Sequence, residues 1–179
     1  MSRTFARIAA VTGYLPAGVL SNRELSALYP DWSEEKILQK TGIRERRIAG
    51  AAETAADLAT QAANRLFSAQ PIDKGSIDFL IFCTQAPDYF LPTSACLIQD
   101  RLGLGTTCGA LDITLGCSGY VYGLSLAKGL IESGSASRVL LLTADTYSKF
   151  IHPLDKSVRT LFGDGATATA SSDNGPRLP

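Results

Sequence analysis

The chain has 179 residues, of which 45% are hydrophobic and 19% charged, a composition typical of a soluble globular domain with a large core. Seventeen basic and seventeen acidic residues cancel, so the sequence gives no electrostatic reason to expect binding to nucleic acid or to an anionic membrane. No apolar run reaches the ~18 residues of a membrane span, and the first residues lack a signal-peptide core. We therefore expect a cytoplasmic protein with a single domain over residues 1–179.

The expected elements of the first third of the chain are one strand and two short helices. Phe5–Gly13 is apolar enough for a strand. Ser21–Glu24 has the pattern of a capping box and predicts the start of a helix, and Ser33 predicts the start of a second helix that ends before Gly42. The basic segment Ile43–Ile48 has two interpretations, a solvated loop or a phosphate-binding patch.

The middle of the chain predicts two helices around a buried strand. Glu53–Ser68 has the periodicity of an amphipathic helix. Ile77–Cys83 is apolar nearly throughout, which indicates a strand covered on both faces. Gln85–Pro92 is expected to be a loop that exposes two aromatic residues, and Ser94–Leu102 is expected to return to helix.

The remaining elements complete an alternation of strands and helices. We expect strands at Gly109–Leu115, Val139–Ala144 and Thr160–Ser171, a helix at Ser118–Ser133 and a polar connection at Lys149–Arg159. This alternation predicts an α/β fold with a mostly parallel, five-stranded mixed sheet and helices on both faces. The tail at residues 173–179 is turn-like and marks a possible domain edge.

Four cysteines are present, and their spacing does not suggest a metal site. Cys83, Cys96, Cys108 and Cys117 form no CxxC pair and have no Cys/His ligand spacing. In a reducing cytosol they should be free thiols, so we expect neither a disulfide nor a metal. We also expect no bound cofactor.

Cys117 has the most informative surroundings of the four. It lies where a strand ends and a helix begins, and Gly116 and Gly119 leave the turn free of bulk. The unpaired amides and the positive dipole end of a helix N-terminus favour a thiolate. Two interpretations stay open from these residues alone: Cys117 is a nucleophile, or it is a small buried hydrophobic residue.

Four motifs together resemble the ketoacyl-acyl-carrier-protein synthase III group of the thiolase-like superfamily. They are Lys40–Arg46 (KTGIRER), Pro92–Ala95 (PTSA), Gly116–Tyr120 (GCSGY) and Leu161–Ala166 (LFGDGA). Members of this group consist of two similar α/β halves, and the resemblance covers only the first. It therefore implies that this sequence is a thiolase-like half.

The resemblance implies an acyltransferase in which Cys117 is the nucleophile. This cysteine would take an acyl group from acyl-CoA, a substrate rather than a cofactor. A malonyl thioester on acyl carrier protein would lose carbon dioxide, and its carbanion would attack the acyl-enzyme in a Claisen condensation of fatty-acid or related biosynthesis. The resemblance also implies a homodimer formed through the strand before Cys117.

The family's catalytic His and Asn come from the second half and have no counterpart here. The only histidine, His152, does not match the family's motif, so we expect the fragment alone not to complete the condensation. Two further hypotheses remain open. The chain is a non-catalytic half-domain that serves as a binding or assembly module, or it belongs to a condensing enzyme of quinolone, polyketide or ketone biosynthesis.

Departures from the family bear on the substrate. The tryptophan and arginine that hold the CoA adenine in the fatty-acid enzymes fall at Lys36 and Lys40, and Trp32 lies one helical turn upstream. A further family arginine on the CoA side falls at Lys156. Leu91 stands where a phenylalanine often shapes the acyl pocket, which suggests more room for the acyl chain. The residues that the resemblance assigns to substrate binding are Lys36, Lys40, Arg44, Leu91, Lys156 and Phe162.

Overall fold

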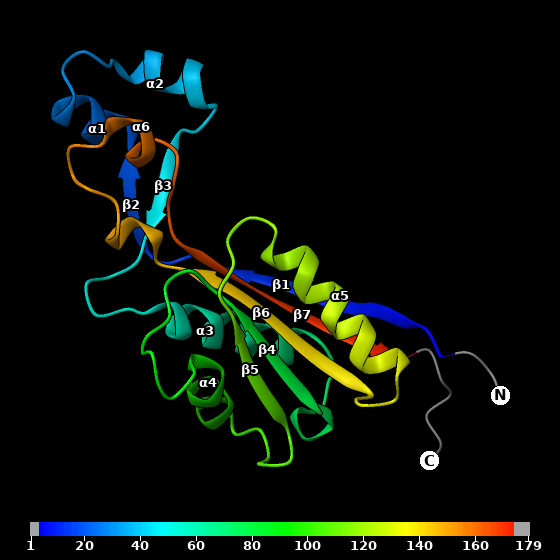
Figure 1. Ribbon diagram of the computed structural model, residues 1–179. Helices are drawn as coiled ribbons and strands as arrows, with labels where there is room; N and C mark the ends of the chain where they lie inside the picture. The colour runs from blue at the N-terminus through cyan, green and yellow to red at the C-terminus, as the bar shows by residue number, and fades with distance from the viewer. Residues whose placement is uncertain (1–3, 174–179) are drawn as a thin grey trace.

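The computed structural model describes residues 4–173, so all but the first residue of the turn expected at 173–179 lies outside the described residues. The described chain contains two sheets with helices packed around them (Figure 1). The strands are β1 (Ala6–Tyr14), β2 (Gly18–Ser21), β3 (Glu45–Ile48), β4 (Phe79–Cys83), β5 (Gly109–Ile113), β6 (Arg138–Asp145) and β7 (Gly165–Asp173). The helices are α1 (Asn22–Leu28), α2 (Glu34–Thr41), α3 (Ala55–Ala69), α4 (Ser94–Leu102), α5 (Gly119–Glu132) and α6 (Lys156–Arg159), with short 3-10 turns η1 (Lys74–Ser76) and η2 (Tyr147–Lys149).

The large sheet has five strands in the order β1-β7-β6-β4-β5. Strand β4 pairs in parallel with both β5 and β6, whereas β7 pairs antiparallel with both β6 and β1. The mixed five-stranded sheet expected from the sequence is therefore confirmed, but its parallel share is smaller than expected. The reason is that β1 and β7, which come from the two ends of the described chain, pair with each other as an antiparallel extension.

Helices cover both faces of this sheet, with α3 and α4 on one face and α5 on the other (Figure 1). The alternating side chains of β4 and β6 show how both faces become buried. Leu80 and Leu142 pack on the α3–α4 side, while Ile81 and Leu141 pack on the α5 side, and all four are fully buried. The nearly continuous apolar sequences of these strands follow from this two-sided burial.

A smaller lobe at one end of the sheet combines the antiparallel pair β2–β3 with α1, α2 and α6 (Figure 1). The helix starts predicted there are confirmed: Ser21 forms a reciprocal capping box with Glu24, and the Ser33 side chain caps α2, which ends at Gly42 in the left-handed conformation. The two short helices enclose a small core of Leu25, Tyr29 and Ile37.

The basic segment 43–48 is neither a solvated loop nor, at its centre, a phosphate patch. Residues Glu45–Ile48 form β3, which pairs antiparallel with β2. The Arg46 side chain is 3% exposed, and its guanidinium donates to the carbonyl of Thr160 and to the side-chain oxygen of Asn22. Arg46 therefore joins β3 to α1 and α6, a structural role that depends on partners far away in the sequence.

Candidate active site

Cys117 lies in the short connection between β5, which ends at Ile113, and α5, which begins at Gly119. Its side chain is exposed, so the interpretation of a small buried hydrophobic residue is wrong. Gly119 is required for close packing at this position, because a Cβ atom there would lie 2.2 Å from the Sγ of Cys83. The strand–turn–helix unit expected around Cys117 is confirmed.

Two of the backbone amides at the start of α5 are not used in hydrogen bonds within the described residues. The amide of Gly119 donates to the carbonyl of Gly116 at 2.8 Å, and that of Tyr122 donates to the carbonyl of Ser118 at 3.1 Å. Within residues 4–173, no acceptor is recorded for the backbone amides of Cys117 and Ser118. Free N–H groups at a helix N-terminus stabilise negative charge on a sulfur or on an oxyanion nearby.

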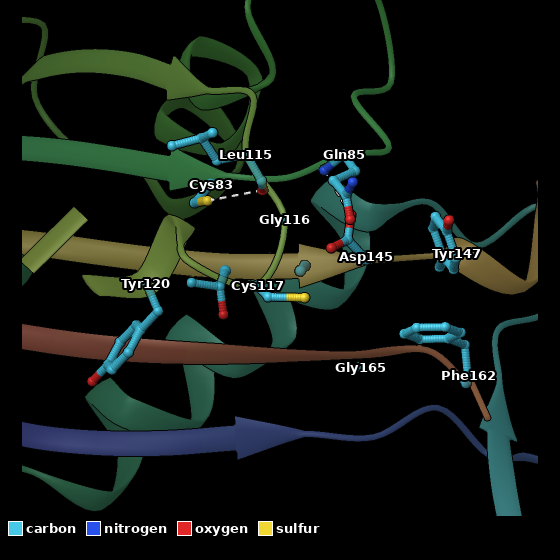
Figure 2. A pocket seen from close by; sticks show the side chains of 13 residues that line it. Cys83, Gln85, Leu115, Gly116, Cys117, Tyr120, Asp145, Tyr147, Phe162 and Gly165 are labelled. Atoms are coloured by element: carbon cyan, nitrogen blue, oxygen red, sulfur yellow. Dashed lines mark hydrogen bonds between the residues drawn. The ribbon is translucent and has the colours of Figure 1, made fainter. Parts of the chain in front are cut away.

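A cavity of about 320 Å³ opens beside Cys117 (Figure 2). It lies at the ends of β4, β5 and β6, at the carboxyl edge of the parallel strands, where α/β sheets commonly bind ligands. Most of its lining is apolar, as in a site for a small acyl group. The lining residues are Cys83, Gln85, Leu115, Gly116, Cys117, Tyr120, Thr143, Ala144, Asp145, Tyr147, Phe162, Gly163 and Gly165.

Cys83 lines the same cavity as Cys117 but is unsuited to be the nucleophile. Its side chain is 4% exposed, and its Sγ donates to the carbonyl of Leu115 at 3.4 Å (Figure 2). Burial raises the pKa of the Cys83 thiol, and the charge of Asp145 raises it further, whereas the hydrogen bond to Leu115 opposes both. The thiol form of Cys83 is thereby favoured, whereas Cys117 is the exposed sulfur of the cavity.

Asp145 is the acidic residue of the cavity and lies at the end of β6. Its Oδ1 accepts hydrogen bonds from the backbone amide of Gln85 at 2.7 Å and from the hydroxyl of Thr84 at 3.1 Å. Burial raises the pKa of the Asp145 carboxyl above its usual range, against the effect of these hydrogen bonds, and Asp164 adds to the rise. Asp145 thus fixes the turn that follows β4.

Asp164 does not line the cavity itself but fixes the turn at 163–165, whose glycines do. This buried carboxylate accepts hydrogen bonds from the amides of Ala49 and Ser148 and from the Ser148 hydroxyl, at 2.6 to 2.9 Å. Its neighbours Gly163 and Gly165 line the cavity, and a Cβ at Gly163 would lie 2.7 Å from the carbonyl of Arg47. The turn at 163–165 therefore supports the site through its backbone and its aspartate.

Three of the predicted substrate-binding residues come together away from this cavity, in the small lobe. The ammonium groups of Lys36, Lys40 and Lys156 lie 5.8, 5.5 and 5.8 Å from the centre of the Trp32 ring. Asp31 is the acidic neighbour, at 3.9 Å from Lys156. An indole surrounded by ammonium groups from two separate segments is suited to a ligand that is both aromatic and anionic.

The other predicted binding residues are dispersed. Phe162 lines the cavity and meets Tyr147 edge to face, with 5.1 Å between the ring centres. Arg44 is exposed in the small lobe, and Leu91 is 82% exposed in the loop before α4. His152 is exposed and does not line the cavity.

Among the polar residues that line the cavity, sequence reasoning missed Gln85, Asp145 and Tyr147, as well as Thr143 within β6. Gln85 lies two residues after β4, the strand next to β5, and Asp145 and Tyr147 lie at or just after the end of β6, on the other side of β4. The signal that would have identified them is the strand order, since parallel strands bring their carboxyl ends to one edge of the sheet. No cluster of metal-ligating residues and no helix able to span a membrane occurs between residues 4 and 173.

Comparisons with known proteins agree with this fold and with the motifs. A family model for 3-oxoacyl-[acyl-carrier-protein (ACP)] synthase III matches residues 111–176. The beta-ketoacyl-[acyl-carrier-protein] synthase III of Xylella fastidiosa (strain Temecula1 / ATCC 700964) is 44% identical over 176 residues, which are 97% of this chain and 54% of that protein.

Two solved structures are similar along nearly the whole described chain. A crystal structure of a 3-oxoacyl-(acyl-carrier-protein) synthase III is 66% identical in sequence, with a TM-score of 0.94. The match covers 97% of this chain and 52% of the chain in that structure. A 3-oxoacyl-(acyl-carrier protein) synthase from Burkholderia xenovorans LB400 is 40% identical in sequence, with a TM-score of 0.92. This match covers 96% of this chain and 49% of the Burkholderia chain.

These similarities extend over almost all of this chain but over about half the length of the relatives that it matches. They confirm the thiolase-like α/β half that was expected from the motifs. By sequence and by fold, the chain is similar over almost all of its length to about half of a beta-ketoacyl-[acyl-carrier-protein] synthase III, in agreement with its motifs.

Proposed function

We propose that this chain is the acyl-accepting half of a decarboxylating condensing enzyme, with Cys117 as its nucleophile. The Cys117 thiolate attacks the carbonyl carbon of an acyl-CoA, and the tetrahedral oxyanion collapses with loss of the CoA thiolate. The sulfur then carries the acyl group as a thioester. A malonyl thioester on acyl carrier protein loses carbon dioxide, and its carbanion attacks the acyl carbonyl and releases Cys117.

The observation that carries this proposal is the placement of Cys117. Its exposed side chain lines a cavity of acyl-group size, at the N-terminus of a helix with two free backbone amides beside it. Both requirements of acyl transfer, a stabilised thiolate and a stabilised oxyanion, are served by such amides. Cys83, in contrast, is buried and favoured as a thiol.

The lysine–tryptophan cluster of the small lobe supports acyl-CoA as the donor. CoA carries an adenine ring and several phosphate groups at the end far from its thioester. Trp32 offers an aromatic surface, and Lys36, Lys40 and Lys156 offer positive charge around it. We assign the nucleotide end of the donor to this cluster, with the family's arginines replaced by ammonium groups that contact phosphate as point charges.

Condensation is proposed to require groups beyond residues 4–173. His152, the only histidine, is exposed and is not among the residues that line the cavity. Apolar side chains on the outer face of α5, Val121, Tyr122 and Leu126, are 64%, 60% and 37% exposed. An apolar helix face of this kind is suited to pack against another half-domain, which would bring the missing catalytic groups next to Cys117.

The partner subunit of the proposed homodimer would pair with β5. This strand is at the edge of the large sheet, with β4 as its neighbour on one side. The amide of Gly109 and the carbonyl of Ile113 are hydrogen-bonded on the β4 side, so the intervening Ala110 and Asp112 direct their backbone groups outward. Unpaired groups on an edge strand favour pairing with a second strand.

The proposal is tested with the natural full-length protein, acyl-CoA and malonyl-acyl carrier protein. We expect release of carbon dioxide with formation of a 3-oxoacyl carrier thioester, and loss of this product by at least ~10³-fold in Cys117→Ala, since the covalent intermediate cannot form. The matched control is Cys96→Ala, which removes the other exposed thiol and should retain activity. Equal product formation by Cys117→Ala and the unaltered enzyme would refute the proposal.

A further inference from the structure

Gln85 contributes a carboxamide to the Cys117 cavity that the fold itself does not use. Its backbone amide donates to Asp145 at 2.7 Å, which fixes the main chain at the end of β4. Within the described chain, no hydrogen-bond partner is recorded for its side chain, and the residue is exposed toward the cavity that it lines. Figure 2 shows Gln85 beside Gly116 and above Asp145.

The carboxamide lies directly against the backbone next to Cys117. A Cβ atom placed on Gly116 would be 2.8 Å from the Gln85 Oε1 and 2.9 Å from its Cδ. The absence of a side chain at Gly116 is what allows this approach. Gly116 is the residue before Cys117 in the sequence. The Gln85 carboxamide therefore contacts the backbone next to the residue whose sulfur would carry the acyl group.

Several other polar side chains of the lining already have partners within the protein. The hydroxyls of Thr143 and Thr167 lie 2.7 Å apart, and those of Tyr120 and Thr169 lie 3.2 Å apart. Cys83 donates to the carbonyl of Leu115. Gln85 therefore differs from these neighbours in keeping both its N–H donors and its carbonyl acceptor available for a bound molecule.

We propose that Gln85 is a specificity-determining residue that selects acyl groups bearing a hydroxyl close to the thioester, such as 3-hydroxyacyl chains. A hydroxyl donates one hydrogen bond and accepts others, which matches the two free ends of a carboxamide. A plain hydrocarbon in the same place would shield the carboxamide from solvent without offering it a hydrogen bond, which costs binding free energy. This inference rests on the proposed acylation of Cys117 and adds the class of acyl group.

The test is a competition between two donors that differ by one hydroxyl group. The full-length protein is mixed with equimolar racemic 3-hydroxybutyryl-CoA and butyryl-CoA, and the two Cys117 adducts are quantified by intact mass at early times. We expect the hydroxylated adduct to form about 5- to 10-fold faster, the discrimination that one neutral hydrogen bond supplies. In Gln85→Met, which has a similar shape and cannot form that bond, the ratio should approach one.

The matched control is Gln61→Met, on the exposed surface of α3, which should keep the ratio of the unaltered protein. A ratio of one or less in the unaltered protein, or a ratio that Gln85→Met leaves unchanged, would overturn the inference. If Gln85→Met fails to fold, the ratio of the two adducts is compared between the unaltered protein and Gln85→Leu. The inference then requires a preference for the hydroxylated adduct in the unaltered protein and its loss in Gln85→Leu. A failure of both donors to label Cys117 would instead count against the proposed function, so the two failures are distinguishable.

Discussion

Asp145 is an ionisable residue that the fold half buries at the edge of the Cys117 cavity. Two hydrogen bonds to its Oδ1 hold the turn after β4, and the same burial raises the pKa of its carboxyl. The proton is therefore bound more tightly in the folded state than in the unfolded chain, where an aspartate titrates near pH 4. The stabilisation that this proton provides is complete below about pH 4 and is lost as the pH rises through the folded-state pKa.

Asp145→Asn should remove this pH dependence while keeping an oxygen that accepts from Gln85 and Thr84. The free energy of unfolding of the unaltered protein should fall relative to that of Asp145→Asn as the pH rises from about 4, and the difference should level off above the raised pKa. Urea denaturation of both proteins over a pH series measures this difference. Parallel curves would show that folding does not shift the pKa of Asp145, and a difference of opposite sign would show that folding lowers it; either result would contradict the prediction.

At the level of single residues, sequence reasoning succeeded where the signal was local. The glycines on either side of Cys117 indicated a tight turn at a helix start, and the structure has that turn. The assignment of Gln85 and Asp145 to the cavity depends on β4, β5 and β6 being neighbours. No local pattern encodes that neighbourhood, so these residues could not be found without the strand order.

The start of helix α5 depends on a close contact between Gly119 and Cys83. An alanine at Gly119 would direct its Cβ to 2.2 Å from the Cys83 Sγ and 3.1 Å from the Cβ of Leu115. The neighbouring groups must therefore shift, and the unit that presents Cys117 shifts with them. Gly129 lies on the same helix, where an added Cβ meets nothing within 4 Å.

Gly119→Ala should destabilise the protein by about 1–3 kcal/mol through overpacking and should slow acylation of Cys117. The double variant Cys83→Ala/Gly119→Ala should recover part of both losses, because the sulfur that collides is removed. Gly129→Ala is the matched control and should stabilise the helix by about 0.5–1 kcal/mol. Thermal or urea unfolding and acylation rates report on these effects, and a Gly119→Ala variant as stable as Gly129→Ala would contradict the packing described.

Helices and strands whose own sequence carries a cap or an apolar pattern were predicted. Strands that form only by pairing with a segment far away in the sequence were not. The serine caps of α1 and α2 and the apolar sequence of β4 each point to one structure. Strand β3 is short and rich in charge, so its own sequence does not predict a strand. It forms because it pairs with β2, and each pair of facing residues is separated by at least 24 positions in the sequence. Arg46 became buried for the same reason, since its acceptors come from α1 and from the residue after α6.

For the molecule as a whole, the motifs gave the fold class and the resemblance to the synthase III group, and both are confirmed. The sheet is less parallel than the alternation of elements suggested, because β1 and β7 close it from the two ends of the described chain. The two proposed binding regions also lie in different parts of the fold. The Cys117 cavity is at the carboxyl edge of the large sheet, and the Trp32 cluster includes lysines of α2 and α6, two helices of the small lobe.

The account depends most on one sulfur atom, that of Cys117, being the site of covalent acylation. The direct measurement is peptide mapping by mass spectrometry after brief incubation of the full-length protein with butyryl-CoA, applied also to Cys117→Ala and Cys96→Ala. We predict one thioester, on the peptide that contains Cys117, retained in Cys96→Ala and absent from Cys117→Ala. An acyl group located on Cys96 or Cys83, or equal labelling of Cys117→Ala, would contradict the account.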